Sequence, residues 1–140
     1  MNLTVPRELA ERANAFLPNL EKFLLKQGIP KRVVDDHLDP KAFGAPSPDA
    51  GDADLHRHLL DQLHRRVGTV LSIAELAPLS SKQAIALALV EDGGLEYHAV
   101  AKLCLCEVGT IKSRINRGRW ILKPDEMQKH KEKISKKKKQ

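Results

Sequence analysis

The stretch that decides the fold is CEVGTIKSRINRGRW, from Cys106 to Trp120. Its apolar residues Val108, Ile111 and Ile115 recur at steps of three and four, which is the spacing of one face of an α-helix. Lysine and arginine occupy much of the remaining surface. A narrow apolar stripe beside a cationic face is compatible with a solvated surface helix, a helix on a membrane surface, or a helix in a groove of nucleic acid.

A helical wheel disfavours the membrane-surface alternative and leaves the other two open. The apolar side carries β-branched residues, a glycine and a leucine, which suits packing on another helix and is too narrow for a membrane-surface helix. The opposite side has short polar groups and a guanidinium in its middle and cations at both margins, as a major groove requires. A solvated face would tolerate the same order. The candidate DNA-binding residues are Thr110, Lys112, Ser113, Arg114, Asn116, Arg117 and Arg119.

Two of these side chains suit direct reading of bases. Arg117 is the best candidate for bidentate contact with a guanine, because its planar fork matches two acceptors on that base. Asn116 could pair in the same way with an adenine. The pattern therefore predicts a protein that binds duplex DNA, in which some side chains contact specific bases and others contact phosphates.

The charge distribution points to a polyanionic partner. The formal net charge is +6, and residues 1–70 carry ten Lys/Arg and ten Asp/Glu, which cancel. Residues 71–140 carry 14 Lys/Arg against 8 Asp/Glu, and Gly109 to Gln140 alone holds 12 against 3. The positive field thus begins at the quoted stretch and continues to the C-terminus. Composition alone would fit nucleic acid or an acidic membrane equally well.

The N-terminal part predicts helices followed by a linker. Residues 6–27 carry apolar side chains at helical spacing. Pro18 interrupts them, so we expect a break or a fresh helix start there, and Gly28 is expected to end the element. A short helical piece follows. Residues 39–54 are rich in Pro, Gly, Ala and Asp without an apolar repeat, which predicts a linker.

The second half predicts four further helices. Residues 55–71 resume helical periodicity, and SSKQ at Ser80 to Gln83 has the spacing of a capping box, which starts a helix. Residues 84–90 are apolar enough for a buried strand, but the cap and the alanine content favour helix. A short helix from Tyr97 to Cys104 and a turn precede the quoted stretch. Helix, short helix, tight turn and helix is the order of a helix-turn-helix unit.

Nothing in the sequence predicts a metal site or an enzyme. Cys104 and Cys106 lack a second ligand pair and are expected to be reduced thiols in or beside a turn. His56, His58 and His64 do not share the spacing that clamps a metal on a helix. No nucleophile–base set, phosphate-binding glycine loop or convergent carboxylate pair stands out. We therefore expect no catalytic residue, cofactor, metal or small-molecule substrate.

The chain also lacks the signals of export and membrane insertion. It has no apolar run of about 18 residues, and its N-terminus lacks the order of a secretory signal. We expect a cytoplasmic protein without a membrane partner.

The quoted stretch and its surroundings resemble a known family. LEYHAVAKLCLCEVGTIKSRINRGRWIL, Leu95 to Leu122, resembles region 4 of extracytoplasmic-function (ECF) sigma factors of bacterial RNA polymerase, most closely at VGTIKSRINRGR. Leu76 to Gly94 resembles the segment that precedes it, and residues 55–123 are covered in all. The resemblance implies that this domain docks on the −35 promoter element while another surface holds the β-subunit flap of the polymerase. By position it places Thr110, Lys112, Ser113, Arg114 and Arg117 on DNA.

Two residues depart from the family pattern at the turn. Leu105 stands where the turn glycine is expected, so a positive φ there would cost about 1 kcal/mol. Glu107 adds an acid at the start of the last helix, which favours the helix dipole and disfavours a phosphate bound at that end.

The resemblance is faint in the N-terminal part. Phe16 to Leu38 resembles the beginning of sigma region 2, with Asp35 and Asp36 in place of an acidic motif. The aromatic and basic helix that opens the −10 element in the family has no counterpart, because the chain has no aromatic residue between Phe43 and Tyr97. Independent promoter opening is therefore not expected.

These observations predict an all-α protein, a small helical bundle with a C-terminal region 4-like helix-turn-helix unit. The predicted organisation is an N-terminal helical segment (residues 1–43), a linker (44–54), the region 4-like domain (55–123) and a basic disordered tail (124–140). The predicted function is a bacterial sigma-like regulator of transcription initiation that binds promoter DNA and RNA polymerase. The alternative is an interaction module that mimics a sigma factor and binds an anti-sigma factor or the polymerase flap without DNA.

Overall fold

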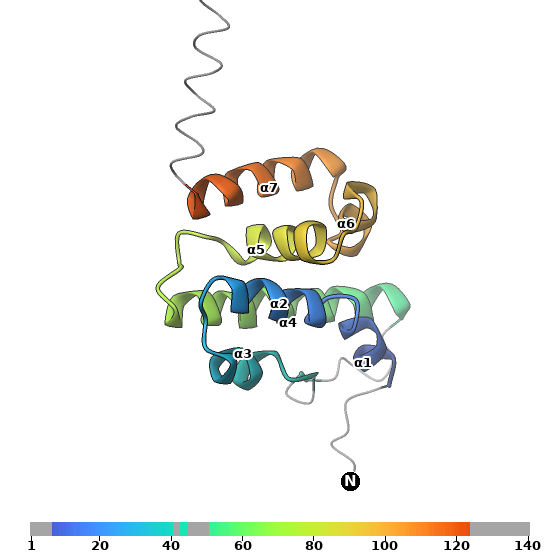
Figure 1. Ribbon diagram of the computed structural model, residues 1–140. Helices are drawn as coiled ribbons and strands as arrows, with labels where there is room; N and C mark the ends of the chain where they lie inside the picture. The colour runs from blue at the N-terminus through green and yellow to red at the C-terminus, as the bar shows by residue number, and fades with distance from the viewer. Residues whose placement is uncertain (1–6, 41–42, 45–50, 124–140) are drawn as a thin grey trace, which may run out of the picture.

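The chain folds as an all-α protein, as the sequence predicts. The computed structural model describes residues 7–40, 43–44 and 51–123, and the predicted tail lies outside them. Helix α7 forms one end of the structure, α5 and α6 lie beneath it, α2 and α4 follow, and α3 and α1 lie at the opposite end (Figure 1). The elements are α1 (Arg7–Ala13), α2 (Leu17–Lys26), α3 (Lys31–Leu38), α4 (Asp52–Ile73), α5 (Ser81–Leu87), a π-helical turn η2 (Ala88–Asp92), α6 (Tyr97–Leu103) and α7 (Val108–Leu122).

Proline and glycine set the bounds of α2. Pro18 lies in its first turn, where a residue without a backbone N–H costs nothing, so the predicted fresh helix start is confirmed. The helix ends at Lys26, and Gly28 follows with φ +86°. That left-handed conformation lets the N–H of Ile29 donate to the carbonyl of Leu24 at 3.3 Å, which closes the helix end as predicted.

The predicted linker extends too far. Helix α4 begins at Asp52, so the last three residues of the predicted 44–54 segment are helical. Apolar periodicity begins only at Leu55, but Asp52 and Asp54 occupy the first turn, where acidic side chains interact favourably with the helix dipole. Arg12 of α1 also forms an ion pair with Asp52. Residues 45–50 lie outside the described ranges.

The capping box at the start of α5 is confirmed. The N–H of Gln83 donates to Ser80 Oγ at 3.1 Å, and the N–H of Ser80 donates to Gln83 Oε1 at 3.0 Å. The apolar run that follows is helical, as predicted, and it widens into η2, where the N–H of Gly93 donates to the carbonyl of Ala88 at 2.9 Å. The sequence signals a helix here but not its widening.

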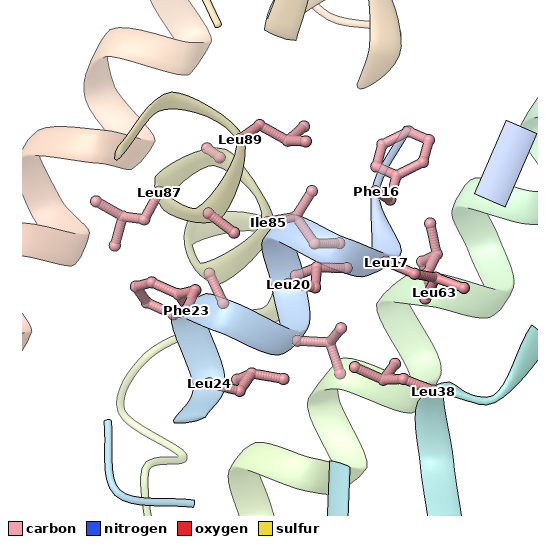
Figure 2. Packing of buried hydrophobic residues seen from close by; sticks show 14 of the residues in the cluster. Phe16, Leu17, Leu20, Phe23, Leu24, Leu38, Leu63, Ile85, Leu87 and Leu89 are labelled. Carbon is pink, nitrogen blue, oxygen red and sulfur yellow. The ribbon is translucent and has the colours of Figure 1, made fainter. Parts of the chain in front are cut away.

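The N-terminal helices share a hydrophobic core with the rest of the chain. Phe16, Leu20 and Phe23 lie beside Ile85 and Leu89, and all five belong to one cluster of buried residues (Figure 2). Helix α2 packs mainly on η2, and α3 packs on α4. The division into separate domains remains a prediction. Because the two parts share a core, they are expected to unfold together.

An ion pair also connects α2 to η2. Lys26 Nζ lies 2.5 Å from Asp92 Oδ1. The Asp92 side chain is only 2% exposed, whereas that of Lys26 is 57% exposed. Lys26 therefore supplies the cation for a buried carboxylate at the end of η2, and its removal would leave that carboxylate uncompensated.

Candidate nucleic-acid interface

A four-residue turn joins α6 to α7 and fixes the angle between them. Leu105 has φ +54°, so the residue that stands where the family pattern has glycine adopts the left-handed conformation. The N–H of Leu105 donates to the carbonyl of Lys102 at 3.3 Å, and the N–H of Cys106 donates to that of Ala101 at 3.0 Å. The turn is thus held by backbone hydrogen bonds, while the Leu105 side chain is 49% exposed.

The apolar side of α7 packs on α5 and α6 as the wheel predicts. Ile111 and Ile115 are fully buried, and Gly118 is buried as well. A Cβ atom at Gly118 would lie 2.6 Å from Leu87 Cδ1, so the absence of a side chain lets α7 approach α5 closely. This anchorage fixes which side of α7 faces outward.

The outward side of α7 carries most of the predicted DNA-binding residues. Lys112, Ser113, Asn116 and Arg117 are exposed. The N-terminal helices lie on the far side of α5 from α7 and leave this surface uncovered (Figure 1). We call these four residues the α7 face. They form a polar and cationic surface on an element whose position is set by buried contacts.

The remaining predicted residues lie at the margins of the α7 face. Thr110 and Arg114 are half-buried, and Arg114 Nη1 donates to Cys106 Sγ at 3.6 Å. Arg119 donates from Nε to Glu91 Oε1 at 2.7 Å, so its charge is partly offset by η2. The sequence already singles out Arg117 among the four cations of α7, and the structure adds that Arg114 and Arg119 have side-chain partners of their own.

The structure adds a cationic neighbour that the sequence reading missed. Burial lowers the pKa of His64 first, and the charges of Lys82 and Arg114 lower it further. Lys82, exposed near the start of α5, is therefore a second cation in the neighbourhood of His64, as Arg114 is. The only sequence signal for Lys82 is its place beside the capping box. His64 Nδ1 lies 3.3 Å from Ser81 Oγ, which makes it a partly packed histidine.

Trp120 is less exposed than its position on the helix suggests. On a helical wheel of α7 it falls nearly opposite Ile111, but it is half-buried and lines an apolar hollow of about 300 Å³ with Gln83, Arg117 and Ile121. A wheel cannot show that Gln83 of α5 shares this hollow, because that arrangement is tertiary.

The two cysteines occupy the predicted positions in and beside the turn. Cys104 ends α6, and burial raises the pKa of its thiol to about 12. Both thiols are free. Within residues 7–40, 43–44 and 51–123, no cluster of three or more His, Cys, Asp or Glu side chains could hold a metal ion. No helix in those same ranges is long and apolar enough to cross a membrane.

Comparison with known proteins supports a partial relationship to sigma factors. Over 46 residues the chain is 50% identical to the ECF RNA polymerase sigma factor EcfG of Rhodopseudomonas palustris strain TIE-1. The match covers 33% of this chain and 25% of that protein, so the chain spans about a quarter of its relative's length. No protein-family profile matches the chain. No solved structure matches it either. The similarity therefore relates about a third of the chain to an ECF sigma factor.

Proposed function

We propose that the protein regulates transcription by binding promoter duplex DNA through the α7 face, as a sigma-like partner of RNA polymerase. The observation that carries the proposal is the exposure of Ser113, Asn116 and Arg117 on a helix that Ile111 and Ile115 anchor from behind. Recognition from a rigid element places side chains more accurately than recognition from a loop. An exposed helical face of this width fits a major groove.

Under this proposal each side chain has a role that its chemistry and exposure support. Arg117 donates two N–H groups to a guanine, and Asn116 donates to and accepts from an adenine. Lys112 contacts phosphate on one margin of the face. Arg114 and Lys82 contact phosphate on the other, where they add affinity without reading sequence. Arg119 reaches a phosphate only by leaving Glu91, which makes it a weaker contributor.

RNA polymerase is the second proposed partner. The relative is named an RNA polymerase sigma factor, and the region 4 resemblance implies contact with the −35 element and the β-subunit flap. Both partners occur in the bacterial cytoplasm, which is the location we propose. The function is regulatory and non-enzymatic, because the α7 face offers hydrogen-bond donors and charge rather than reacting groups.

The proposal is tested by selecting bound sequences from a random duplex library. The affinity of the protein for the selected duplex is then measured at several salt concentrations. Lys112→Ala is expected to weaken binding to all sequences and to reduce the logarithmic salt slope by about 1. Arg117→Ala is expected to relax preference at one base pair by about 1 to 3 kcal/mol. Selection that enriches no sequence, or affinity that ignores salt, contradicts the proposal.

One observation favours the alternative, a sigma mimic that binds an anti-sigma factor or the polymerase flap without DNA. Helices α1, α2 and α3 share a core with the later helices and bring no aromatic platform for opening DNA. Transcription in vitro with core polymerase tests the expected inability to open promoters but does not separate the two hypotheses. Both hypotheses predict no start-site-specific transcript from the chain alone. The first hypothesis predicts that Arg117→Ala weakens binding to promoter DNA in the presence of the polymerase. The second predicts that Arg117→Ala leaves binding to the protein partner unchanged.

A further inference from the structure

Residues of α2, α3 and their flanking segments line a groove. Both helices lie on the far side of α5 from α7 (Figure 1). The volume of the groove is about 440 Å³, which lies within the range of ligand and peptide sites. Leu17, Val34 and Leu38 form its apolar floor, and each is nearly or fully buried. We call this feature the α2–α3 groove. Because Leu17, Val34 and Leu38 are 8%, 1% and 6% exposed, the floor presents only their outer edges to a ligand.

Acidic residues border the groove on both sides. Glu21 lines it from α2, Asp35 lines it from α3, and Asp39 lies just beyond the end of α3. This is the same sign of charge as a phosphate backbone, so the groove disfavours nucleic acid. An apolar floor with acidic borders is complementary to a surface that is apolar in its centre and basic at its edges.

An ion pair within the protein shows that the acidic residues at the edge of the groove accept a cation. Lys31 Nζ lies 3.7 Å from Glu21 Oε1 and 3.3 Å from Asp35 Oδ2, so an ammonium group bridges the two helices. The hydrogen bond and charge of Asp35, and then the charge of Glu21, raise the pKa of Lys31. The Lys31 side chain is 66% exposed, which leaves it free to move away when another cation approaches.

We propose that the α2–α3 groove binds a basic amphipathic helix of a partner protein. Aliphatic side chains of the partner contact Leu17, Val34 and Leu38, and an arginine of the partner replaces Lys31 between Glu21 and Asp35. Arginine is favoured because its planar fork bonds carboxylates in pairs, which an ammonium cannot do. This mode of binding is the helix-in-groove recognition seen where an apolar face enters a shallow cleft. It is independent of DNA binding by the α7 face.

The test uses the full chain and a labelled synthetic helix of about 18 residues with leucine on one face and arginine on the other. Its affinity is measured by fluorescence anisotropy. The wild-type chain is expected to bind this probe and to ignore a second probe in which glutamate replaces arginine. Asp35→Lys is expected to weaken binding by about tenfold. Lys31→Gln is expected to strengthen it, because the internal competitor for Glu21 and Asp35 is removed.

Matched variants make the outcome specific to the groove. Asp36→Lys changes the same charge one residue further along α3, on an exposed side chain that does not line the groove, and is expected to leave the affinity nearly unchanged. Arg117→Ala is expected to have no effect, which separates this inference from the proposed function. Equal weakening by Asp35→Lys and Asp36→Lys would overturn the inference. So would displacement of the probe by a peptide of residues 124–140, because the chain's own lysine-rich end would then fill the groove.

Discussion

Leu105 adopts a backbone conformation that is unfavourable for any residue with a Cβ atom. Its φ of +54° costs about 1 to 2 kcal/mol for an L-residue, whereas glycine is unstrained there. Glycine loses about 0.5 to 1 kcal/mol through the entropy of the unfolded chain. We therefore expect Leu105→Gly to raise the free energy of unfolding by up to about 1 kcal/mol, measured by urea denaturation.

Leu25→Gly is the matched control for that change. Leu25 is 37% exposed on α2, so the same substitution there is expected to lower the free energy of unfolding by about 1 kcal/mol. Opposite signs for the two variants support strain at the α6–α7 turn. Destabilisation by both would show that the side chain of Leu105 contributes more through its contacts than its backbone costs.

His64 links stability to pH. Burial and the nearby cations Lys82 and Arg114 lower its folded pKa below the ordinary value of 6.5. The unfolded chain therefore binds the proton first, so the stability contributed by neutral His64 is present above pH 6.5 and is lost as the pH falls through 6.5 toward the folded pKa. We expect the free energy of unfolding to fall less between about pH 7.5 and 5.5 in His64→Gln than in the wild type. His98→Gln, on an exposed histidine, is the control, and an equal effect of both variants contradicts this assignment.

At the scale of the element, the close approach of α7 to α5 depends on Gly118. A Cβ atom there would lie 2.6 Å from Leu87 Cδ1, and Leu87 is fully buried and has little room to move. Gly118→Ala is therefore expected to destabilise the protein by about 1 to 3 kcal/mol, measured by urea denaturation.

Gly109 offers a matched control on the same helix. Nothing lies within 4 Å of a Cβ atom at that position. Gly109→Ala is expected to be neutral or to stabilise by up to about 1 kcal/mol, through helix propensity alone. A neutral Gly118→Ala variant would show that α5 and α7 can separate slightly without loss, and would contradict tight packing as the device that orients the α7 face.

Elements specified by local chemistry could be predicted, and those that depend on tertiary contacts could not. The capping box at Ser80 and the restart at Pro18 follow from residues within a few positions of each other. A positive φ at Leu105 is indicated only by the resemblance to a family pattern with glycine at that position. The first turn of α4 could not be predicted, because it lacks apolar periodicity and is supported by Arg12 from another helix. The ion pair of Arg119 with Glu91 joins residues 28 apart, so a helical wheel, which places Arg119 only at the margin of the cationic side, cannot show that its charge is partly offset.

At the scale of the whole molecule, the shared core couples the N-terminal helices to α7. Asp92 is buried and has its cation from Lys26, so Lys26→Ala leaves a buried carboxylate without that partner. We expect this variant to lower the free energy of unfolding by about 2 kcal/mol. Trp120 is the single tryptophan and reports on α7, whereas circular dichroism reports on all helices.

Coincident transitions are expected for the two probes, with the same shift in Lys26→Ala. Lys22→Ala, an exposed lysine on the same helix, is the control and is expected to change little. Separate transitions, with Trp120 unaffected by Lys26→Ala, would contradict coupling and would favour two independent domains joined by a linker. The sequence predicts those two domains because the apolar pattern along the chain cannot show which helices share a core.

The central claim is that the α7 face binds duplex DNA, and a comparison of two arginines tests it most directly. Arg117 is exposed in the middle of the face, whereas Arg119 is paired with Glu91 at 2.7 Å, so the two alanine variants remove the same charge from the same helix. The measurement is the dissociation constant for a selected duplex at fixed salt. Arg117→Ala is predicted to weaken binding by about 1 to 3 kcal/mol and Arg119→Ala by less than about 1 kcal/mol. Equal losses for the two variants, or no loss for either, would contradict the account.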